Sequence, residues 1–469
     1  MSPEIFERVS PEICGVSSKD IINFIGALCN PPQGQETHSF MLLRHKKVLA
    51  EGYFSPFAPE TPNVVYSISK AFTAMAIGWL REEGKLNIND KIAAYFPEYQ
   101  VHPSVEQLTV KHLLMMGTGQ AGKSLIQSIP SELNSDIAEF LMTPVEVAPG
   151  TEFRYQNRVT YILAALATKL SGEDLMDYLN KKVFSPMGIE KPYAVRDRYG
   201  ICIGYSGLRL RLEELAAFGV MLSDNGRWNG KQILPHGWAE EQLRCQIGKA
   251  SAEKGDWEQG YCYQLWRGRY NTSRLCGAYG QMCVMMPDYD AVFVTNSGYY
   301  ADIQYILESF YNKIMLKMSP TPLKEDKLST ELLAKMTNGL QLHSLYSTRS
   351  PLEMELESKD IAIQNSSAHL RLMFDGDKVS IIIKRDDKKD ITFSAGFKKS
   401  EITPASYGDI SELDSAENAE WSAAAYWKSL SELCITARLI PTPVVMTLDI
   451  SLKDGIPQAD CIVRRGNNL

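Results

Sequence analysis

The sequence lacks any apolar run long enough to cross a membrane. Its best candidate, residues 71–80, is about half of the ~20 residues that a membrane-spanning helix needs. The N-terminal segment, residues 1–15, carries several charged side chains and no apolar stretch of signal-peptide length. We therefore predict a cytoplasmic protein that is not exported by a standard route and has no membrane partner.

Cysteine and histidine are too dispersed to form the sites that they commonly build. The nine cysteines are odd in number and contain no CxxC pair, so we expect reduced thiols and no disulfide framework. The seven histidines form no HExxH motif and no cluster with acidic residues. Since zinc needs three or four converging ligands, we predict no metal site.

The charge balance gives no reason to expect a nucleic acid partner. The formal net charge is −7, the pI is near 5.7, and the basic residues are scattered along the chain. The hydrophobic share of 44% is normal for a globular protein, and 469 residues are enough for two domains.

Residue periodicity predicts a mixed α and β region followed by a mostly-β region. Helical spacing marks residues 68–83, 158–171, 213–223 and 303–315, and strand-like composition marks residues 41–53, 282–286 and 291–296. The polar, proline-containing stretch 318–327 is typical of a domain boundary. Beyond it, alternating apolar residues on both sides of Asp375-Gly376 predict a β-hairpin. We predict a first domain at 1–318 and a mostly-β C-terminal domain of unknown role at 330–469.

The first chemical motif, Ser67-Ile68-Ser69-Lys70, opens the first predicted helix. Residues i and i+3 at a helix start lie on one face, so the amine of Lys70 can reach the hydroxyl of Ser67. The helix N-terminus favours developing negative charge, and a lysine in a dry pocket can take the serine proton. On this motif alone, a simple capping role for Ser67 stays an equal alternative.

The second motif, Tyr155-Gln156-Asn157, stands just before the next predicted helix. Residues two apart lie on the same side of an extended segment, so the phenol of Tyr155 and the amide of Asn157 would face one site. A phenol beside a lysine can shuttle a proton, and an amide can hold the lysine and the substrate. By itself, the motif is explained better by a half-buried tyrosine and a capping asparagine.

Together with other segments, these motifs resemble the family of class C β-lactamases, DD-peptidases and family VIII esterases. The segments, in family order over about residues 35–315, are 66–72 (YSISKAF), 84–90 (GKLNIND), 108–114 (LTVKHLL), 149–151 (PGT), 155–157 (YQN), 186–189 (PMGI), 207–209 (GLR) and 229–235 (NGKQILP). The resemblance implies an α/β (α+β) fold with an antiparallel sheet flanked by helices, plus an all-helical subdomain. It also implies that Ser67 is the serine that becomes acylated and that Lys70 and Tyr155 together act as the base that deprotonates it. Asn157 would be the amide that orients the lysine and the substrate.

The third family motif departs from its usual form. Where the family usually has Lys-Thr-Gly or His-Thr-Gly, residues 276–281 are Cys-Gly-Ala-Tyr-Gly-Gln, which resembles the branch of nylon-oligomer hydrolases and related esterases. The cation that holds the carboxylate of β-lactams is therefore missing. Arg274 is a candidate replacement, although we favour a solvated arginine at this position.

The same resemblance assigns backbone and substrate contacts near this motif. It implies an oxyanion hole made by the N–H groups of Ser67 and Ala278. It places Gly277 and Tyr279 beside the substrate, and the glycines permit a close backbone approach.

We therefore expect a serine hydrolase that cleaves an ester, amide or peptide-like bond in a small molecule through an acyl-enzyme, without a cofactor. A β-lactamase or DD-peptidase is the second hypothesis, which the missing cation and the predicted cytoplasmic location disfavour. A catalytically silent binding module is the third, and the presence of Ser67, Lys70 and Tyr155 argues against it. Whether the C-terminal domain covers the pocket, forms a homodimer or only stabilises the chain stays open.

Overall fold

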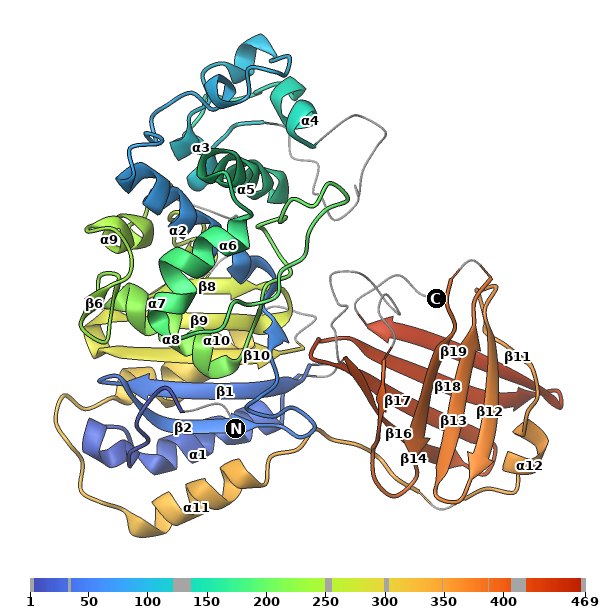
Figure 1. Cartoon of the computed structure of the whole chain (residues 1–469). Coiled ribbons are helices and arrows are strands. Elements are labelled where there is room, and N and C mark those ends of the chain that lie inside the picture. Colours follow the sequence, from blue (N-terminus) through green and yellow to red (C-terminus); the bar gives the residue numbers. More distant parts are fainter. Residues whose placement is uncertain are drawn as a thin grey trace.

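The computed structural model describes residues 4–32, 35–120, 136–248, 255–298, 303–347, 349–386, 388–405 and 419–464. Two sheets organise these residues into two units (Figure 1), a first unit with a six-stranded sheet and a second unit with a nine-stranded sheet. Within the described residues, no helix combines the length and the apolar character needed to cross a bilayer. Each of the nine cysteines is a free thiol, and most of them are buried.

The sheet of the first unit is antiparallel throughout. Its strands are β1 (Thr37–Arg44), β2 (Lys47–Tyr53), β7 (Trp266–Arg267), β8 (Ser273–Gly277), β9 (Gln281–Met286) and β10 (Ala291–Ser297). They lie in the order β2-β1-β10-β9-β8-β7, so the N-terminal hairpin pairs with strands from far along the chain. The strands predicted at 41–53, 282–286 and 291–296 are confirmed.

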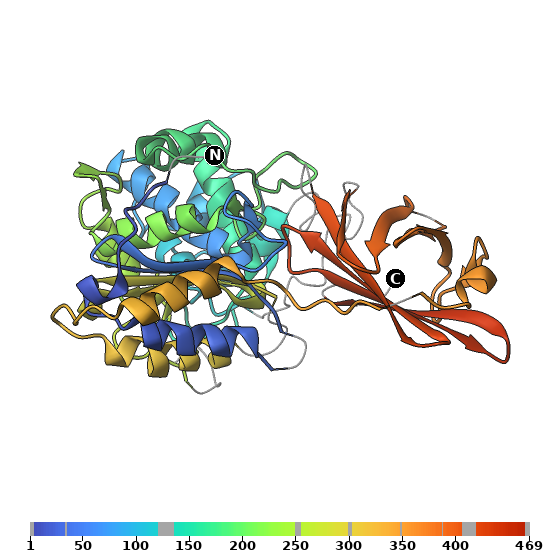
Figure 2. The same ribbon diagram turned by 90° about the horizontal axis from the view of Figure 1, so that it is seen from below.

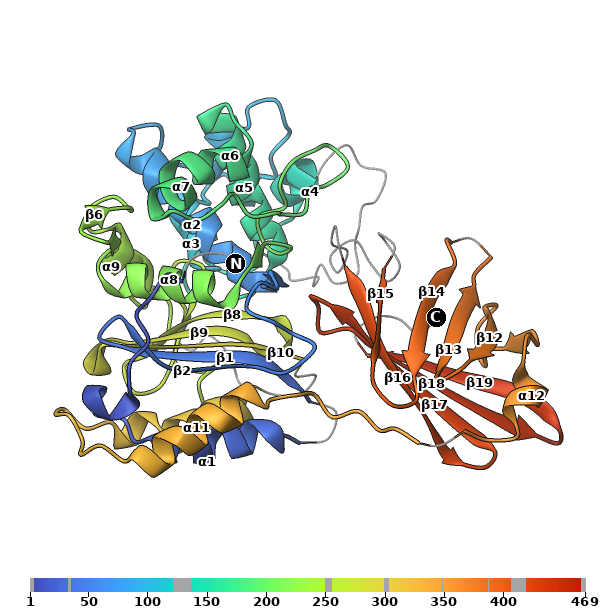
Figure 3. The same ribbon diagram turned by 60° about the horizontal axis from the view of Figure 1, so that its bottom comes forward.

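Helices cover both faces of this sheet. On one face lie α1 (Ser18–Cys29), α10 (Gln304–Lys313) and α11 (Lys327–Asn338), and on the other lies α8 (Leu212–Ser223), as Figure 2 and Figure 3 show. Two apolar cores result, one between α1, α10 and the sheet and one that joins α8 to the remaining helices. Since both faces are covered, all eight residues of β1 are buried.

The remaining helices of the first unit form a subdomain above α8 (Figure 1). They are α2 (Ser69–Glu82), α3 (Val110–Leu114), α4 (Asp136–Met142), α5 (Asn157–Ser171), α6 (Leu175–Leu179), α7 (Ser185–Met187) and α9 (Trp238–Leu243). Short strand pairs join β3 (Asn63–Val64) to β4 (Arg209–Leu210) and β5 (Arg227–Trp228) to β6 (Lys231–Gln232). The predicted helices over 68–83, 158–171 and 213–223 are confirmed within one residue at each end. The apolar helix α2 packs against α5 in the centre of this subdomain.

The second unit is a curled sheet with a short helix, α12 (Glu353–Leu356), at one end. Its strands are β11 (Ile361–Ala362), β12 (His369–Asp375), β13 (Lys378–Lys384), β14 (Ile391–Gly396), β15 (Glu401–Pro404), β16 (Glu420–Ser429), β17 (Glu432–Ile440), β18 (Val445–Lys453) and β19 (Ile456–Arg464). The first strand, β11, also contacts the last strand, β19, and just beyond β11 the N–H of Gln364 donates to the carbonyl of Ala459 (2.8 Å). The unit is therefore barrel-like, and apolar side chains such as Ile381, Trp421 and Leu448 fill its interior.

The architecture predicted from the sequence is confirmed: an antiparallel sheet flanked by helices, a helical subdomain and a smaller mostly-β unit. The helix α11 was not predicted. It packs against α1 and β2, and Leu333 and Leu340 join the core of the first unit. The N–H of Leu342 also donates to the carbonyl of Ser55 (2.9 Å). From these contacts we propose that the boundary between the units lies after residue 342 and not within the predicted stretch 318–327.

Candidate active site

Ser67 lies in a sharp turn between β3 and α2. Tyr66, just before it, has a left-handed backbone (φ 47°), and residues Tyr66–Ile68 form one 3-10 turn that continues into α2. Such a conformation is costly for a bulky residue and is found mainly where the surrounding structure enforces it. The turn leaves the Ser67 side chain half-buried at the start of the helix.

Lys70 is fully buried and makes three hydrogen bonds at the start of α2. Its Nζ donates to Ser67 Oγ (2.9 Å), to Asn157 Oδ1 (2.8 Å) and to the carbonyl of Tyr205 (3.0 Å). The i, i+3 contact between Ser67 and Lys70 that the helix geometry predicts is confirmed. Burial lowers the pKa of Lys70 well below its ordinary value, because the charged ammonium loses its hydration.

Tyr155 approaches the same serine from the start of α5. Its ring centroid lies 4.8 Å from Lys70 Nζ, and its phenol interacts with the Ser67 hydroxyl. Removal of the phenol from water raises the pKa of Tyr155, and the interaction with Ser67 offsets only part of that rise. The structure thus brings together the four side chains of the first two motifs, Ser67, Lys70, Tyr155 and Asn157.

Aromatic side chains pack against the Tyr155 ring. The ring stacks on Trp266 (centroids 5.8 Å apart, planes at 21°) and meets the edge of Tyr261 (6.2 Å, 89°). Phe153 contacts both Trp266 and Tyr261. Tyr155 nevertheless remains 36% exposed, so it lies at the surface of this aromatic cluster and not inside it.

The third-motif turn (residues 277–280) packs directly against the turn of Ser67. A Cβ on Gly277 would lie 2.2 Å from the carbonyl oxygen of Val65, so only glycine fits at this contact. The ring of Tyr279 meets the ring of Tyr66 edge-on (5.3 Å), and the Tyr279 backbone is also left-handed (φ 64°). The predicted neighbours of Ser67 on this side are therefore close to it, and Ala278 between them is exposed.

Arg274 does not lie in solvent, so that expectation is wrong. The side chain is fully buried, and its Nη1 donates to the carbonyls of Asp256 (3.2 Å) and Arg267 (3.1 Å). The guanidinium lies over the rings of Trp257 (4.7 Å) and Trp266 (5.8 Å) and forms an ion pair with the buried Asp256 (3.8 Å). Its contacts are within the protein, so it supports the aromatic cluster behind Tyr155.

Sequence reasoning missed three groups that shape this site. The carbonyl of Tyr205 binds Lys70, but every residue has a carbonyl and no sequence signal marks this one. The hydroxyl of Ser69 donates to the carbonyl of Tyr66 (2.6 Å) and braces the turn. The amide of Gln281 donates to the carbonyl of Ser297 (2.6 Å). It also donates to the carbonyls of Ala278 and Tyr279 in the third-motif turn. Gln281 is the last residue of the segment 276–281 that resembles the third family motif, and this position is the sequence signal that could have identified it.

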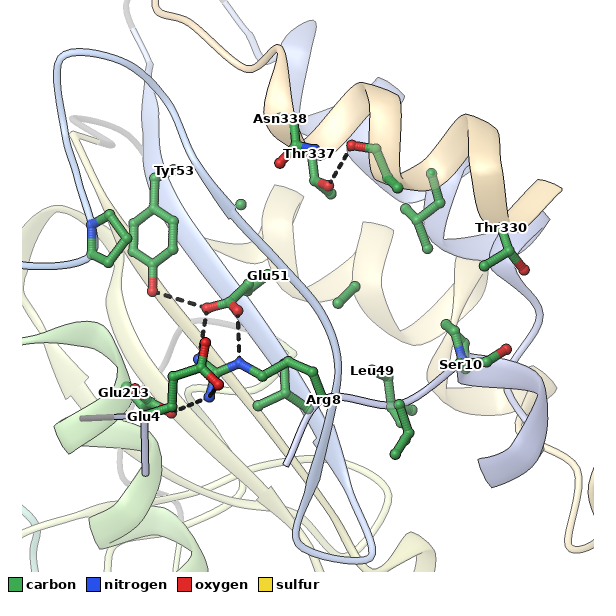
Figure 4. Close-up of a pocket in the computed structure, with 18 of the residues that line it drawn as sticks. Glu4, Arg8, Ser10, Leu49, Glu51, Tyr53, Glu213, Thr330, Thr337 and Asn338 are labelled. Atoms are coloured by element: carbon green, nitrogen blue, oxygen red, sulfur yellow. Dashed lines mark hydrogen bonds and ion pairs between the residues drawn. The ribbon is translucent and has the colours of Figure 1, made fainter. Parts of the chain in front are cut away.

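A cavity of about 780 Å³ lies elsewhere in the first unit, between the N-terminal segment, β2 and α11 (Figure 4). Its charged side chains pair with one another: Arg8 bonds Glu51 (3.0 Å) and Glu213 (2.7 Å). None of the residues predicted for the site lines this cavity. Among the described residues, no group of three or more His, Cys, Asp or Glu side chains is arranged to hold a metal ion.

Comparison with known proteins identifies the same region of the chain. The family model described as "Beta-lactamase" matches residues 33–301. The 6-aminohexanoate-dimer hydrolase of Paenarthrobacter ureafaciens is 23% identical over 302 residues, which are 56% of this chain and 73% of that protein. The β-lactamase of Escherichia coli (strain K12) is 29% identical over 225 residues, which are 45% of this chain and 57% of that protein. The match with the Escherichia coli protein thus spans less than two thirds of its length.

A solved structure extends the likeness to both units. The structure of SurE with D-Leu has a TM-score of 0.50 and 15% sequence identity, and it covers 90% of this chain and 97% of that chain. At this level of identity the likeness concerns the fold alone. It indicates that another protein also joins a first unit of this kind to a second unit.

Proposed function

The chain belongs to the β-lactamase family, and from that premise we propose that it is a serine hydrolase that cleaves an ester or amide bond through an acyl-enzyme on Ser67. The substrate is a small molecule, and the residues that act are Ser67, Lys70 and Tyr155. The relatives support the reaction class, since the names of two of them denote hydrolases.

The observation that carries the proposal is the set of three partners around Lys70 Nζ. An uncharged amine has two hydrogens and one lone pair. The two carbonyl oxygens, Asn157 Oδ1 (2.8 Å) and Tyr205 O (3.0 Å), are acceptors only and take the two hydrogens. The charged ammonium donates its third hydrogen to Ser67 Oγ at 2.9 Å. When the amine is uncharged, its lone pair takes that position and can accept the serine proton.

The pKa shifts of the two basic groups support a division of roles. Burial lowers the pKa of Lys70, so its amine gives up its proton more readily than an exposed lysine does, whereas the raised pKa of Tyr155 disfavours loss of the phenol proton. Lys70 is therefore the better base, and Tyr155 the better donor to the leaving group. Environments that push two titratable groups apart in this way are typical of acid and base pairs in active sites.

The reaction then proceeds in two halves. Ser67 Oγ attacks the substrate carbonyl as its proton passes to Lys70, and the resulting oxyanion lies between the N–H groups of Ser67 and Ala278. The bond to the leaving group breaks as that group takes the proton, through Tyr155, and the acyl group stays on Ser67. Water then loses a proton to the same base and attacks the acyl carbon. The bond from that carbon to Ser67 Oγ breaks, the base returns its proton to Ser67 Oγ, and the acid is released. Each oxyanion donor is worth about 3 kcal/mol in systems of this kind.

The surroundings of Arg274 favour an ester or amide over a β-lactam. The guanidinium is fully buried against two tryptophans and pairs with Asp256, so it is not free to hold a substrate carboxylate. We expect short p-nitrophenyl esters to be hydrolysed faster than nitrocefin. Equal or faster turnover of nitrocefin would move the assignment to a β-lactamase or DD-peptidase.

Covalent labelling tests the nucleophile. We expect a fluorophosphonate probe to label the wild-type protein on Ser67, as read by peptide mass spectrometry, and to leave Ser67→Ala unlabelled. Ser185→Ala, which removes an exposed serine on α7, serves as the matched control and should keep full labelling. Equal labelling of wild type and Ser67→Ala would remove Ser67 from its role as nucleophile. No labelling of either protein would leave a binding module without turnover as the better hypothesis.

A further inference from the structure

We propose that the turn between β17 and β18, the docking turn (residues 441–444), positions the catalytic serine by holding the strand that leads to it. This proposal rests on the proposed function, because it assigns the second unit a role in the rate of the same reaction. The strands β16 and β17 extend from the second unit toward the first (Figure 1 and Figure 3). All four residues of the docking turn are buried.

The first contact lies three residues before the nucleophile. The N–H of Val64 in β3 donates to the carbonyl of Pro441 (3.3 Å), and the next N–H, that of Val65, donates to the carbonyl of Leu208 (2.9 Å). The strand is therefore held by the second unit at one residue and by the first unit at the next. A shift of this strand moves Ser67, since only Tyr66 separates it from Val65.

The second contact is a buried ion pair beside the docking turn. Arg438, near the end of β17, donates from Nε and Nη2 to both carboxylate oxygens of Glu36 (2.6–3.2 Å) and from Nη2 to the carbonyl of His343 (3.1 Å). The Arg438 side chain is only 7% exposed. Burial alone would raise the pKa of Glu36, but the guanidinium holds that pKa below its ordinary value. Paired, two-point contacts of this kind fix orientation as well as distance.

The third contact connects the docking turn to the other side of the site. Glu36 accepts at its carbonyl from the N–H of Gly298 (2.7 Å), and a Cβ on Gly298 would lie 3.7 Å from Pro443. The carbonyl just before Gly298, that of Ser297, accepts from the Gln281 amide that braces the third-motif turn. The second unit thus contacts β3 directly, and it is connected to the third-motif turn through Gly298, Ser297 and Gln281.

The docking turn is itself held in one shape. The hydroxyl of Thr442 donates to the carbonyl of Leu439 (2.7 Å) and accepts from the N–H of Val444 (3.1 Å). The N–H of Thr442 donates to the same Leu439 carbonyl (2.9 Å). Because the docking turn is held by its own hydrogen bonds and is buried beside β3, we expect it to fix the position of β3, and with it Ser67, and not only to shield β3 from water. A displacement of about 1 Å in a reacting group can cost on the order of 100-fold in rate.

Replacement of the ion pair in the full-length protein tests this role. We expect Arg438→Gln to lower kcat for a p-nitrophenyl ester by about tenfold or more, with KM changed by less than about threefold, and to slow fluorophosphonate labelling to the same degree. The charge reversal Glu36→Arg with Arg438→Glu should restore at least half of the lost kcat, because it forms the ion pair again with the charges exchanged. Lys428→Gln, which removes the exposed Lys428–Asp449 pair of the same unit, is the control and should leave kcat unchanged.

Two results would overturn the proposal. One is a folded Arg438→Gln protein with the kcat of wild type, and the other is a lowered kcat that the charge reversal does not restore. If Arg438→Gln does not fold, Thr442→Val removes only the hydroxyl bonds of the docking turn, and wild-type kcat in that variant would overturn the proposal as well. A wild-type protein that neither hydrolyses esters nor takes the label would refute the proposed function instead.

Discussion

The two sheets of this protein are built on opposite plans. In the first unit, β1 is buried along its whole length because helices cover both faces of the sheet. In the second unit, β13 alternates exposed and buried residues because one face lines the interior of the barrel and the other faces solvent. A sheet between two helical layers can place helix N-termini and strand ends around one site. In a barrel whose interior is filled with side chains, only the loops and turns at its ends are available for such contacts. We therefore propose that catalysis belongs to the first unit and that one turn of the second unit contributes to it, a division that the following variants test.

The largest effect is expected from replacement of Lys70, the proposed base in the first unit. Lys70→Arg replaces an amine that can lose its proton with a guanidinium that does not, so we expect kcat/KM to fall by about 10⁴-fold. Ester hydrolysis and circular dichroism of the purified variant check this expectation. A folded Lys70→Arg protein with substantial activity would move the base to another residue.

The proton donor should matter next. Tyr155→Phe keeps the ring that stacks on Trp266 and removes only the hydroxyl. We expect a loss of about 10²-fold or more in kcat, as is usual when one general acid is removed. Measurement with leaving groups of different basicity sharpens the assignment, because good leaving groups need less protonation and should lose less rate.

A pair of glycines compares the two units directly. Gly277→Ala would place a Cβ against the Val65 carbonyl, so the third-motif turn must shift, and we expect kcat/KM to fall by about 100-fold through the misplaced oxyanion donor. Gly376→Ala, in the hairpin turn between β12 and β13, has open space around it and only a left-handed backbone (φ 53°). It should cost about 1–2 kcal/mol of stability and leave kcat/KM unchanged. Equal kinetic effects of both variants would contradict the division between the units.

The pH dependence of kcat/KM should follow the protonation of the buried Lys70 amine. Because burial lowers the pKa of Lys70, the uncharged base forms at a lower pH than it does for an exposed lysine. As the pH falls through this lowered pKa, the amine becomes protonated and kcat/KM should fall about tenfold per pH unit. A pH profile whose acid limb lies near the ordinary pKa of lysine would contradict the base assignment.

The smallest effect is expected in the interior of the second unit. Ile381→Val removes one methylene from the filled barrel and should cost about 0.5–1.5 kcal/mol of unfolding free energy, with no change in kcat. Urea denaturation and ester kinetics on the same preparation check both parts. A kcat that drops with this variant would mean that the barrel interior, and not only its docking turn, is coupled to the site.

Much of the fold and part of the site could be predicted from local patterns. Helical pitch alone brings Lys70 to Ser67, and alternation alone predicts the hairpin around Gly376. The helix α11 was missed because it follows a proline-containing stretch that resembles a boundary, and only its packing against α1 and β2 assigns it to the first unit. The surroundings of Arg274 could not be predicted, since they depend on Asp256 and two tryptophans from other segments.

The sequence by itself determined many of the helices and strands and the residue types of the candidate site, because periodicity, helix pitch and family motifs act over short distances along the chain. Only the tertiary structure decided which backbone carbonyl binds Lys70, why Arg274 is buried, and that the second unit contacts β3. The physical reason is that every residue carries the same carbonyl and N–H, so their partners depend on which distant segments pack together. Burial of a charged side chain likewise depends on neighbours that no local pattern specifies.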